Sequence, residues 1–97
     1  IIDPTNNTNI GGISFKYPLT SITYNPKNGY IYVTYYDPYD CNHLQGYVAV
    51  IDPNNNTIIA NITVGGEPDA ILYDPQNGYL YVANSYSGTI SIIKFLD

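Results

Sequence analysis

The residues best suited to chemistry lie in one short segment, Asp37–Gly46, which holds the only cysteine and the only histidine of the chain. Carboxylate, thiolate and imidazole groups bind metal ions when several of them converge. The spacing in this segment matches no structural zinc motif, and the sequence has no second cysteine or histidine cluster. We therefore predict no metal site and interpret the segment as a polar surface loop that contacts a protein partner or a neighbouring repeat. The candidate interaction residues are Asp37, Tyr39, Asp40, Cys41 and His43.

The same segment is a poor candidate for catalysis. A hydrolytic triad needs Ser or Cys, His and a carboxylate held in fixed geometry, whereas His43 lies only two residues from Cys41 in a predicted loop. Glu67 and Asp69 are near enough in sequence to form the paired carboxylates of glycoside hydrolysis. Their position after Gly65-Gly66 favours a loop-capping role instead. We predict no catalytic residues and no cofactor.

The charge of the chain argues against two classes of partner. The formal net charge is −5, three lysines are the only strong cations, and charged residues make up 11% of the chain. Binding of nucleic acid needs clustered Lys or Arg to neutralise phosphates, and attraction to an anionic membrane surface needs the same. No stretch approaches the ~20 apolar residues of a membrane helix. We therefore predict no nucleic-acid partner and no membrane insertion.

The rest of the chain, which holds this loop in place, consists of an internal repeat. Ile2-Asp3-Pro4 recurs as Ile51-Asp52-Pro53, and the segment 24–33 recurs as 73–82, both at an offset of 49 residues. The second unit has only 85–88 where the first has the longer loop 37–46. The spacing from Ile51 to Ile93 is 42 residues and the repeat offset is 49, so the loop carries about seven extra residues. We assign one segment, 1–97, with repeat units at about 1–50 and 51–97. Because Ile1 begins directly in repeat sequence, we expect the chain to be processed or excised from a longer one.

The composition of the repeat predicts an all-β chain. β-branched residues and 12 tyrosines dominate it, and no segment shows an apolar period of 3.6 residues over two turns. In the segment 30–36, residues with even numbers should point to one face of a strand and those with odd numbers to the other. The expected strands are Ile10–Phe15, Leu19–Asn25, Tyr30–Tyr36, Tyr47–Ile51, Ile58–Val64, Ala70–Tyr73, Tyr79–Asn84 and Thr89–Phe95.

The turns between these strands carry their own signals. In Asn25-Pro26-Lys27-Asn28-Gly29, proline pre-sets the backbone of the first corner, and glycine accepts the left-handed conformation that closes a hairpin. Asp3, Asp52 and Asp74 each precede a proline. We interpret them as turn formers, with calcium binding as the less favoured alternative.

The run from Pro68 to Asn84, followed by Ser91-Ile92-Ile93, resembles the YVTN-type β-propeller repeat of surface-layer and secreted proteins. Tyr81-Val82-Ala83-Asn84 carries the signature tetrad, and Tyr32-Val33-Thr34-Tyr35 carries it more loosely. The resemblance covers nearly all of the chain except 37–46. It implies β-propeller blades, which are four-stranded antiparallel sheets of about 42 residues each, with about two blades' worth in this chain.

The resemblance implies a non-enzymatic extracellular module of surface-layer type that mediates protein–protein assembly or adhesion. Two blades cannot close a ring, because closed propellers need roughly four to eight. We therefore expect protein partners, which are either further propeller blades or copies of the chain itself. The contacts would be made by the tyrosine-rich strand edges and by the loop at 37–46.

Two other classes of function stay open. The chain could be a fragment of a propeller enzyme of the lyase, lactonase or dehydrogenase type, although one histidine and no arginine argue against it. It could also bind glycans through tyrosine and asparagine side chains on one face. An extracellular or cell-surface location would allow N-glycosylation, for which the sequence offers sequons at Asn6, Asn55 and Asn61.

Overall fold

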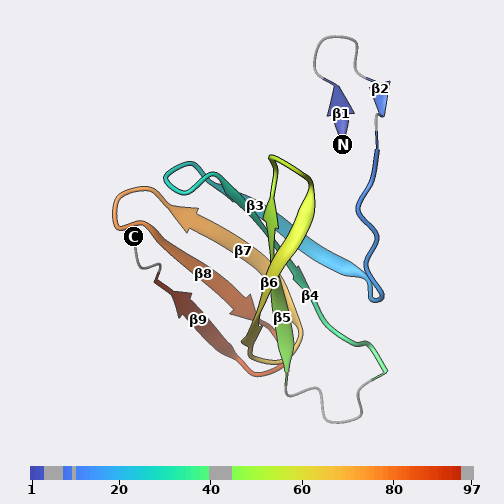
Figure 1. The fold of residues 1–97 in the computed structure, drawn as a ribbon. Coiled ribbons are helices and arrows are strands. Elements are labelled where there is room, and N and C mark those ends of the chain that lie inside the picture. The colour runs from blue at the N-terminus through green and yellow to red at the C-terminus, as the bar shows by residue number, and fades with distance from the viewer. Residues whose placement is uncertain (4–7, 10, 40–44, 95–97) are drawn as a thin grey trace.

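The computed structural model describes residues 1–3, 8–9, 11–39 and 45–94, and all regular structure in these ranges is β-strand (Figure 1). The all-β class is therefore confirmed. The strands are β1 (Ile2–Asp3), β2 (Thr8–Asn9), β3 (Leu19–Asn25), β4 (Tyr30–Tyr35), β5 (Gly46–Asp52), β6 (Thr57–Val64), β7 (Pro68–Asp74), β8 (Tyr79–Asn84) and β9 (Thr89–Ile93).

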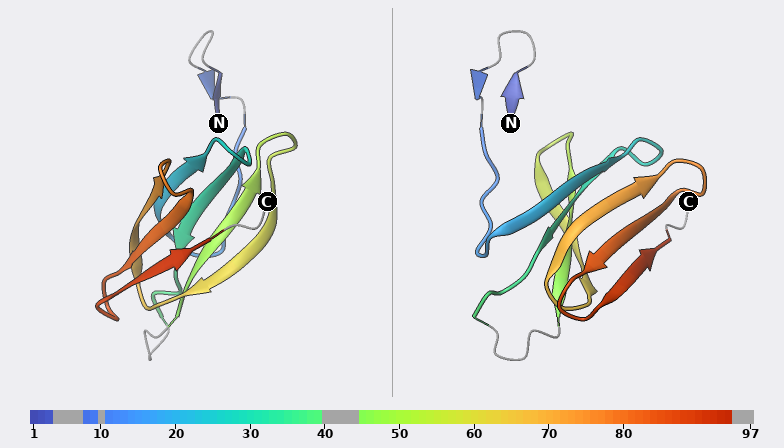
Figure 2. Two further views of the ribbon diagram at one scale, coloured as in Figure 1. Left: turned by 90° about the vertical axis from the view of Figure 1, so that its left-hand side faces the viewer. Right: turned by 180° about the vertical axis from the view of Figure 1, so that it is seen from behind.

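These strands form antiparallel sheets, and within each sheet the order of the strands follows the sequence. The first sheet has four strands in the order β3-β4-β5-β6, and the second sheet has three in the order β7-β8-β9. β1 and β2 form a separate hairpin, which stands apart from both sheets in every view (Figure 2). The assignment of the two sheets as propeller blades stays a prediction.

The first and second sheets pack face to face, with β3 and β4 contacting β7 (Figure 2). Alternation along each strand places one apolar set between the sheets. As predicted for the segment 30–36, Tyr32 and Thr34 face this interior together, and both are fully buried. The core residues are Tyr32, Val48, Val50 and Val64 of the first sheet and Ile71, Tyr73, Leu80 and Val82 of the second sheet.

The predicted hairpin turn is confirmed in both repeat units. Gly29 and Gly78 have φ angles of 78° and 76°, and each donates its N–H to the carbonyl oxygen four residues earlier at 2.8 Å. The side-chain oxygens of Asn25 and Asp74 accept the N–H groups of Lys27 and Gln76 at 2.9 Å. Both residues before proline therefore form turns, as Asp52 also does with Asn54.

Each sheet begins with the same irregularity. The pairing register of β3 with β4 shifts between Leu19 and Ser21, and that of β7 with β8 shifts between Pro68 and Ala70. The extra residue of the first bulge, Thr20, links the sheets. Its Oγ1 lies 2.7 Å from Thr34 Oγ1 and donates to the carbonyl oxygen of Pro68 at 2.7 Å.

The predicted strand at Ile10–Phe15 is wrong over the residues that the structure describes. Residues 11–15 form no strand, and Ile10 lies outside the described ranges. The repeat counterpart of this segment is β6, which pairs with β5 along its length, whereas β1 offers only two paired residues. Gly11 and Gly12 also carry no side chain that could hold the segment against a sheet.

Aromatic packing fixes the chain between this segment and β3. The rings of Phe15 and Tyr17 lie 5.6 and 6.5 Å from the ring of Tyr35, which in turn lies 5.4 Å from that of Tyr47. Tyr35 and Tyr47 are cross-strand partners on β4 and β5. The segment before β3 is therefore held on the side of the first sheet that faces away from the second.

Candidate functional site

The structure describes two of the five candidate interaction residues, Asp37 and Tyr39. Tyr39 is 88% exposed, and its N–H donates to Asp37 Oδ1 at 2.9 Å, so the loop begins with another aspartate turn. Asp40, Cys41 and His43 lie outside the described residues. An exposed tyrosine next to a fixed turn is compatible with a contact surface, and the partner of this loop stays a prediction.

Two of the three sequon asparagines are described, and both are exposed. Asn55 Oδ1 accepts a hydrogen bond from Thr57 Oγ1 at 2.6 Å, and Asn61 Oδ1 accepts one from the hydroxyl of Tyr35 at 2.7 Å. The oxygens make these bonds, so the Nδ2 atoms that would carry a glycan are not used by them. Asn6 lies outside the described residues, and glycosylation stays a prediction.

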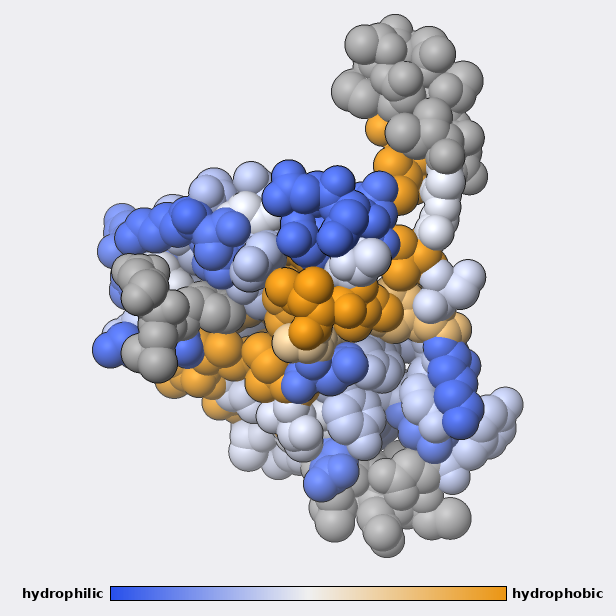
Figure 3. Space-filling view, viewed as in Figure 1, coloured by the Kyte–Doolittle hydropathy of each residue, from blue (hydrophilic) through white to orange (hydrophobic). Residues whose placement is uncertain are grey.

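The second sheet leaves one apolar face uncovered in the described structure. We call it the open face and define it as Ala70, Leu72, Tyr81, Ala83, Ile90 and Ile92. Leu72, Ile90 and Ile92 are 64%, 65% and 62% exposed. A shallow hollow of about 190 Å³ lies on this face. Figure 3 shows that exposed apolar side chains also gather between polar regions in the view of Figure 1. Contiguous apolar surface of this kind marks interaction sites.

The repeat relates the open face to a covered one. Tyr81 corresponds to Tyr32 at the repeat offset, and Ile90 corresponds to Val48 when the strands are aligned on Gly88 and Gly46. In the first sheet these positions are fully buried beneath the second sheet. In the first sheet this side of the strands packs against the second sheet. In the second sheet the corresponding side points away from the first sheet and is exposed.

The side of the first sheet that faces away from the second sheet is also partly exposed. Ile22 and Tyr24 lie there and are 65% and 53% exposed, whereas their counterparts Ile71 and Tyr73 are 9% exposed at the interface. We call the surface around Ile22 and Tyr24 the back face. The back face repeats part of the residue pattern that the second sheet uses to cover the first. Val33 and Ala49 lie on the same side of the first sheet but are already buried. The exposed part of the back face is therefore limited to the surface around Ile22 and Tyr24, and this part is complementary to the open face rather than identical with it.

Burial also changes the acidity of two tyrosines. Burial is the main cause that raises the pKa of the Tyr32 hydroxyl above its usual value of 10.0; the nearby Tyr30 adds to it, and the hydrogen bond from Asn28 opposes it. The pKa of Tyr35 is raised by burial first and then by its neighbours Tyr47 and Tyr17. Both hydroxyls therefore stay protonated at neutral pH and act as hydrogen-bonding groups.

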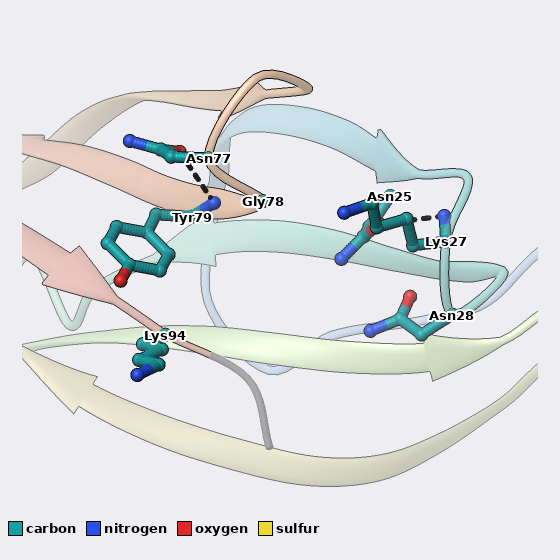
Figure 4. A pocket seen from close by; sticks show the side chains of 7 residues that line it. All are labelled: Asn25, Lys27, Asn28, Asn77, Gly78, Tyr79 and Lys94. Carbon is teal, nitrogen blue, oxygen red and sulfur yellow. Dashed lines mark hydrogen bonds between the residues drawn. The ribbon is translucent and has the colours of Figure 1, made fainter. Parts of the chain in front are cut away.

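A polar pocket lies where the β3–β4 and β7–β8 turns approach each other (Figure 4). It measures about 190 Å³ and is lined by Asn25, Lys27, Asn28, Asn77, Gly78, Tyr79 and Lys94. Reasoning from the sequence missed this pocket, because its lining residues were assigned to separate turns and strands. The signal was the position of the lysines, since two of the three in the chain lie here.

Other kinds of site have no geometric support in the described part of the chain. Among these residues, no three side chains of the His, Cys, Asp and Glu types gather as a metal-binding group. The described ranges also contain no helix long and apolar enough to span a membrane. The loop residues Asp40, Cys41 and His43 fall outside both statements.

No protein-family model matches this chain, and neither curated proteins nor solved structures give a significant match.

Proposed function

We propose that the chain is a non-enzymatic extracellular β-propeller module of surface-layer type, which mediates protein–protein assembly or adhesion. The observation that carries the proposal is the open face of the second sheet. In the repeat, this face corresponds to the face of the first sheet that the second sheet covers. Its occupant is therefore a further sheet of the same repeat, supplied by another copy of the chain or by further blades.

The complementary faces determine the geometry of assembly. The back face of one copy would cover the open face of the next, so each contact joins two different surfaces. Such head-to-tail contacts form closed rings when the rotation between copies permits and open chains otherwise. A ring of this kind is what the proposed propeller architecture requires.

Burial of the open face supplies a driving force of useful size. Leu72, Ile90 and Ile92 are each more than half exposed, and burying a large aliphatic side chain completely is worth roughly 1.5–3 kcal/mol. Association also has an entropic cost of several kcal/mol. Self-association of the isolated chain is therefore expected at high concentration, and it should depend on each apolar residue of the face.

Light scattering on the 97-residue chain tests the proposal. We expect a discrete oligomer that becomes monomeric in Ile90→Asp, because a carboxylate in a covered apolar face has no compensating partner. Tyr39→Asp introduces the same charge at an exposed loop site 88% open to solvent and is the matched control. A wild-type monomer at high concentration would contradict assembly between copies and leave only further blades as the occupant. An oligomer that only Tyr39→Asp disrupts would contradict assembly through the open face.

Of the alternative functions, glycan binding has an observation in its favour. The polar pocket combines asparagine amides with the tyrosine ring of Tyr79, which is the residue chemistry expected of a sugar-binding site. The described residues offer no comparable arrangement for the propeller-enzyme alternative.

A further inference from the structure

The polar pocket is lined by two cations. Lys27 and Lys94 both line it, and no ion pair involves either of them among the described residues. The third lysine, Lys16, is placed differently, with its Nζ 5.4 Å from the ring centre of Tyr17. A protein with net charge −5 thus places two of its three lysines around one hollow.

Like charges around one pocket repel each other, so a structural reason for the arrangement would have to compensate for that repulsion. The turn does not supply one, because the β7–β8 turn adopts the same conformation with glutamine in place of Lys27. The lysine ammonium of Lys27 instead extends across to the opposite turn, where it lies 3.7 Å from the position that a Cβ on Gly78 would take.

Comparison of the two repeat units shows which residues of the pocket differ from their counterparts. Lys27 replaces the glutamine found at Gln76, and Lys94 replaces the aspartate found at Asp52. Asn25, also in the pocket, replaces the aspartate found at Asp74. All three differences make the pocket more positive than the repeat would leave it. Asn25 and Lys27 belong to the β3–β4 turn, whereas Lys94 follows β9 and meets that turn only in the folded chain.

The remaining wall of the pocket supplies neutral hydrogen-bonding groups. Asn25 is only 2% exposed, its Oδ1 accepts from Lys27 N, and its Nδ2 has no acceptor in the described part of the chain. Asn77 Oδ1 accepts from Tyr79 N at 2.9 Å, which fixes the side chain of Asn77 at the rim. Tyr79 and Lys94 lie on one side of the pocket, with Asn25, Lys27 and Asn28 on the other (Figure 4).

We propose that this pocket binds a carboxylated monosaccharide unit, such as a uronic acid. The ammonium groups of Lys27 and Lys94 neutralise the carboxylate, the free amide of Asn25 donates to an oxygen of the ligand, and the ring of Tyr79 packs against the sugar. A hollow of about 190 Å³ accommodates one sugar unit rather than a chain. This site is independent of the open face and does not rest on the proposed assembly.

Binding of glucuronate, measured by NMR titration of the 97-residue chain, tests the proposal. We expect saturable shifts at Lys27, Asn77 and Tyr79, and affinity about tenfold weaker in Lys27→Gln and in Lys94→Gln, as expected for loss of one charged hydrogen bond. Lys27→Gln restores the residue found in the other turn, so the fold should tolerate it. Lys16→Gln removes the same charge outside the pocket and should bind as wild type does.

Glucose and acetate separate the two parts of the ligand. We expect each to bind more weakly than glucuronate, because one lacks the carboxylate and the other lacks the sugar ring. Equal affinity for acetate and glucuronate would overturn a sugar site, and equal affinity for glucose would overturn the role of the lysines. The absence of saturable shifts, or the same loss in Lys16→Gln as in Lys27→Gln, would overturn the proposal altogether.

Discussion

The two sheets present the same side of the same repeat to different surroundings. Tyr32 on β4 is fully buried, while its counterpart Tyr81 on β8 is only half-buried and borders an apolar surface. Their hydroxyls even accept equivalent hydrogen bonds, from Asn28 and Asn77, each at 2.7 Å. The comparison shows that the burial of a repeat position depends on whether another sheet covers it, and not on its local sequence.

Truncation of these two tyrosines should give the largest difference. Tyr32→Ala removes a fully buried aromatic side chain from the core and should lower the free energy of unfolding by about 3–5 kcal/mol. Tyr81→Ala should lower it by about 1 kcal/mol, because that side chain is half-buried. Urea unfolding of both variants in dilute, monomeric samples measures the difference. Equal losses would mean that the open face is covered in solution.

A substitution at Gly46, which lies against Pro68 and Gly65 where the two sheets meet, should have the second largest effect on stability. An alanine Cβ at Gly46 would clash with the ring of Pro68 and lie 2.8 Å from the carbonyl oxygen of Gly65. Gly46→Ala should therefore destabilise the chain by about 1–3 kcal/mol. Gly12→Ala, where a Cβ meets no atom within 4 Å, is the control and should leave the midpoint of unfolding nearly unchanged. A neutral Gly46→Ala would show that the place where the sheets meet is loosely packed.

The two bulge residues should differ by less. Thr20→Val removes the hydrogen bonds to Thr34 and Pro68 and should destabilise the chain by about 1 kcal/mol. Asp69 occupies the corresponding bulge of the second sheet and is exposed, so Asp69→Ala should change stability by less than about 0.5 kcal/mol. The same unfolding measurement compares them, and a larger effect of Asp69→Ala would contradict a role for Thr20 in joining the sheets.

The smallest effect should appear only at alkaline pH. The raised pKa of Tyr32 means that folding favours its protonated form, so this stabilisation is fully present below the unfolded pKa of about 10 and is lost as pH rises through the folded pKa. Tyr32→Phe should flatten the fall in stability above about pH 10. Tyr39→Phe, at an exposed site, should not. Unfolding curves recorded on both sides of this pH measure the slopes.

Most of the strand pattern could be predicted from the sequence because its signals are local. Alternating tyrosine and aliphatic residues marked β4 and β8. The Asn or Asp before proline, with glycine four residues after it, marked the turns that precede them. The prediction was wrong at 11–15, where strand formation depends on a long neighbour that β1 does not provide. A strand exists only when a second strand pairs with it, and pairing is not a local property.

The candidate sites were less accessible to sequence reasoning. The loop at 37–46 was conspicuous because it interrupts the repeat, whereas Lys27 and Lys94 stood out only as two of the three strong cations of the chain. They are far apart in sequence and meet in one pocket only because the β3–β4 and β7–β8 turns lie at the same end of the packed sheets. The open face was hidden for a related reason, since its residues have the same pattern as covered ones.

The sequence by itself determined the repeat, the all-β class, the turns and the two faces of each strand, because these follow from backbone preferences and from the period of the side chains. Only the tertiary structure decided which faces are covered and which side chains share a pocket. Burial and electrostatics depend on distances between segments that are remote along the chain. Identical repeat positions can therefore form the core in one sheet and a docking surface in the next.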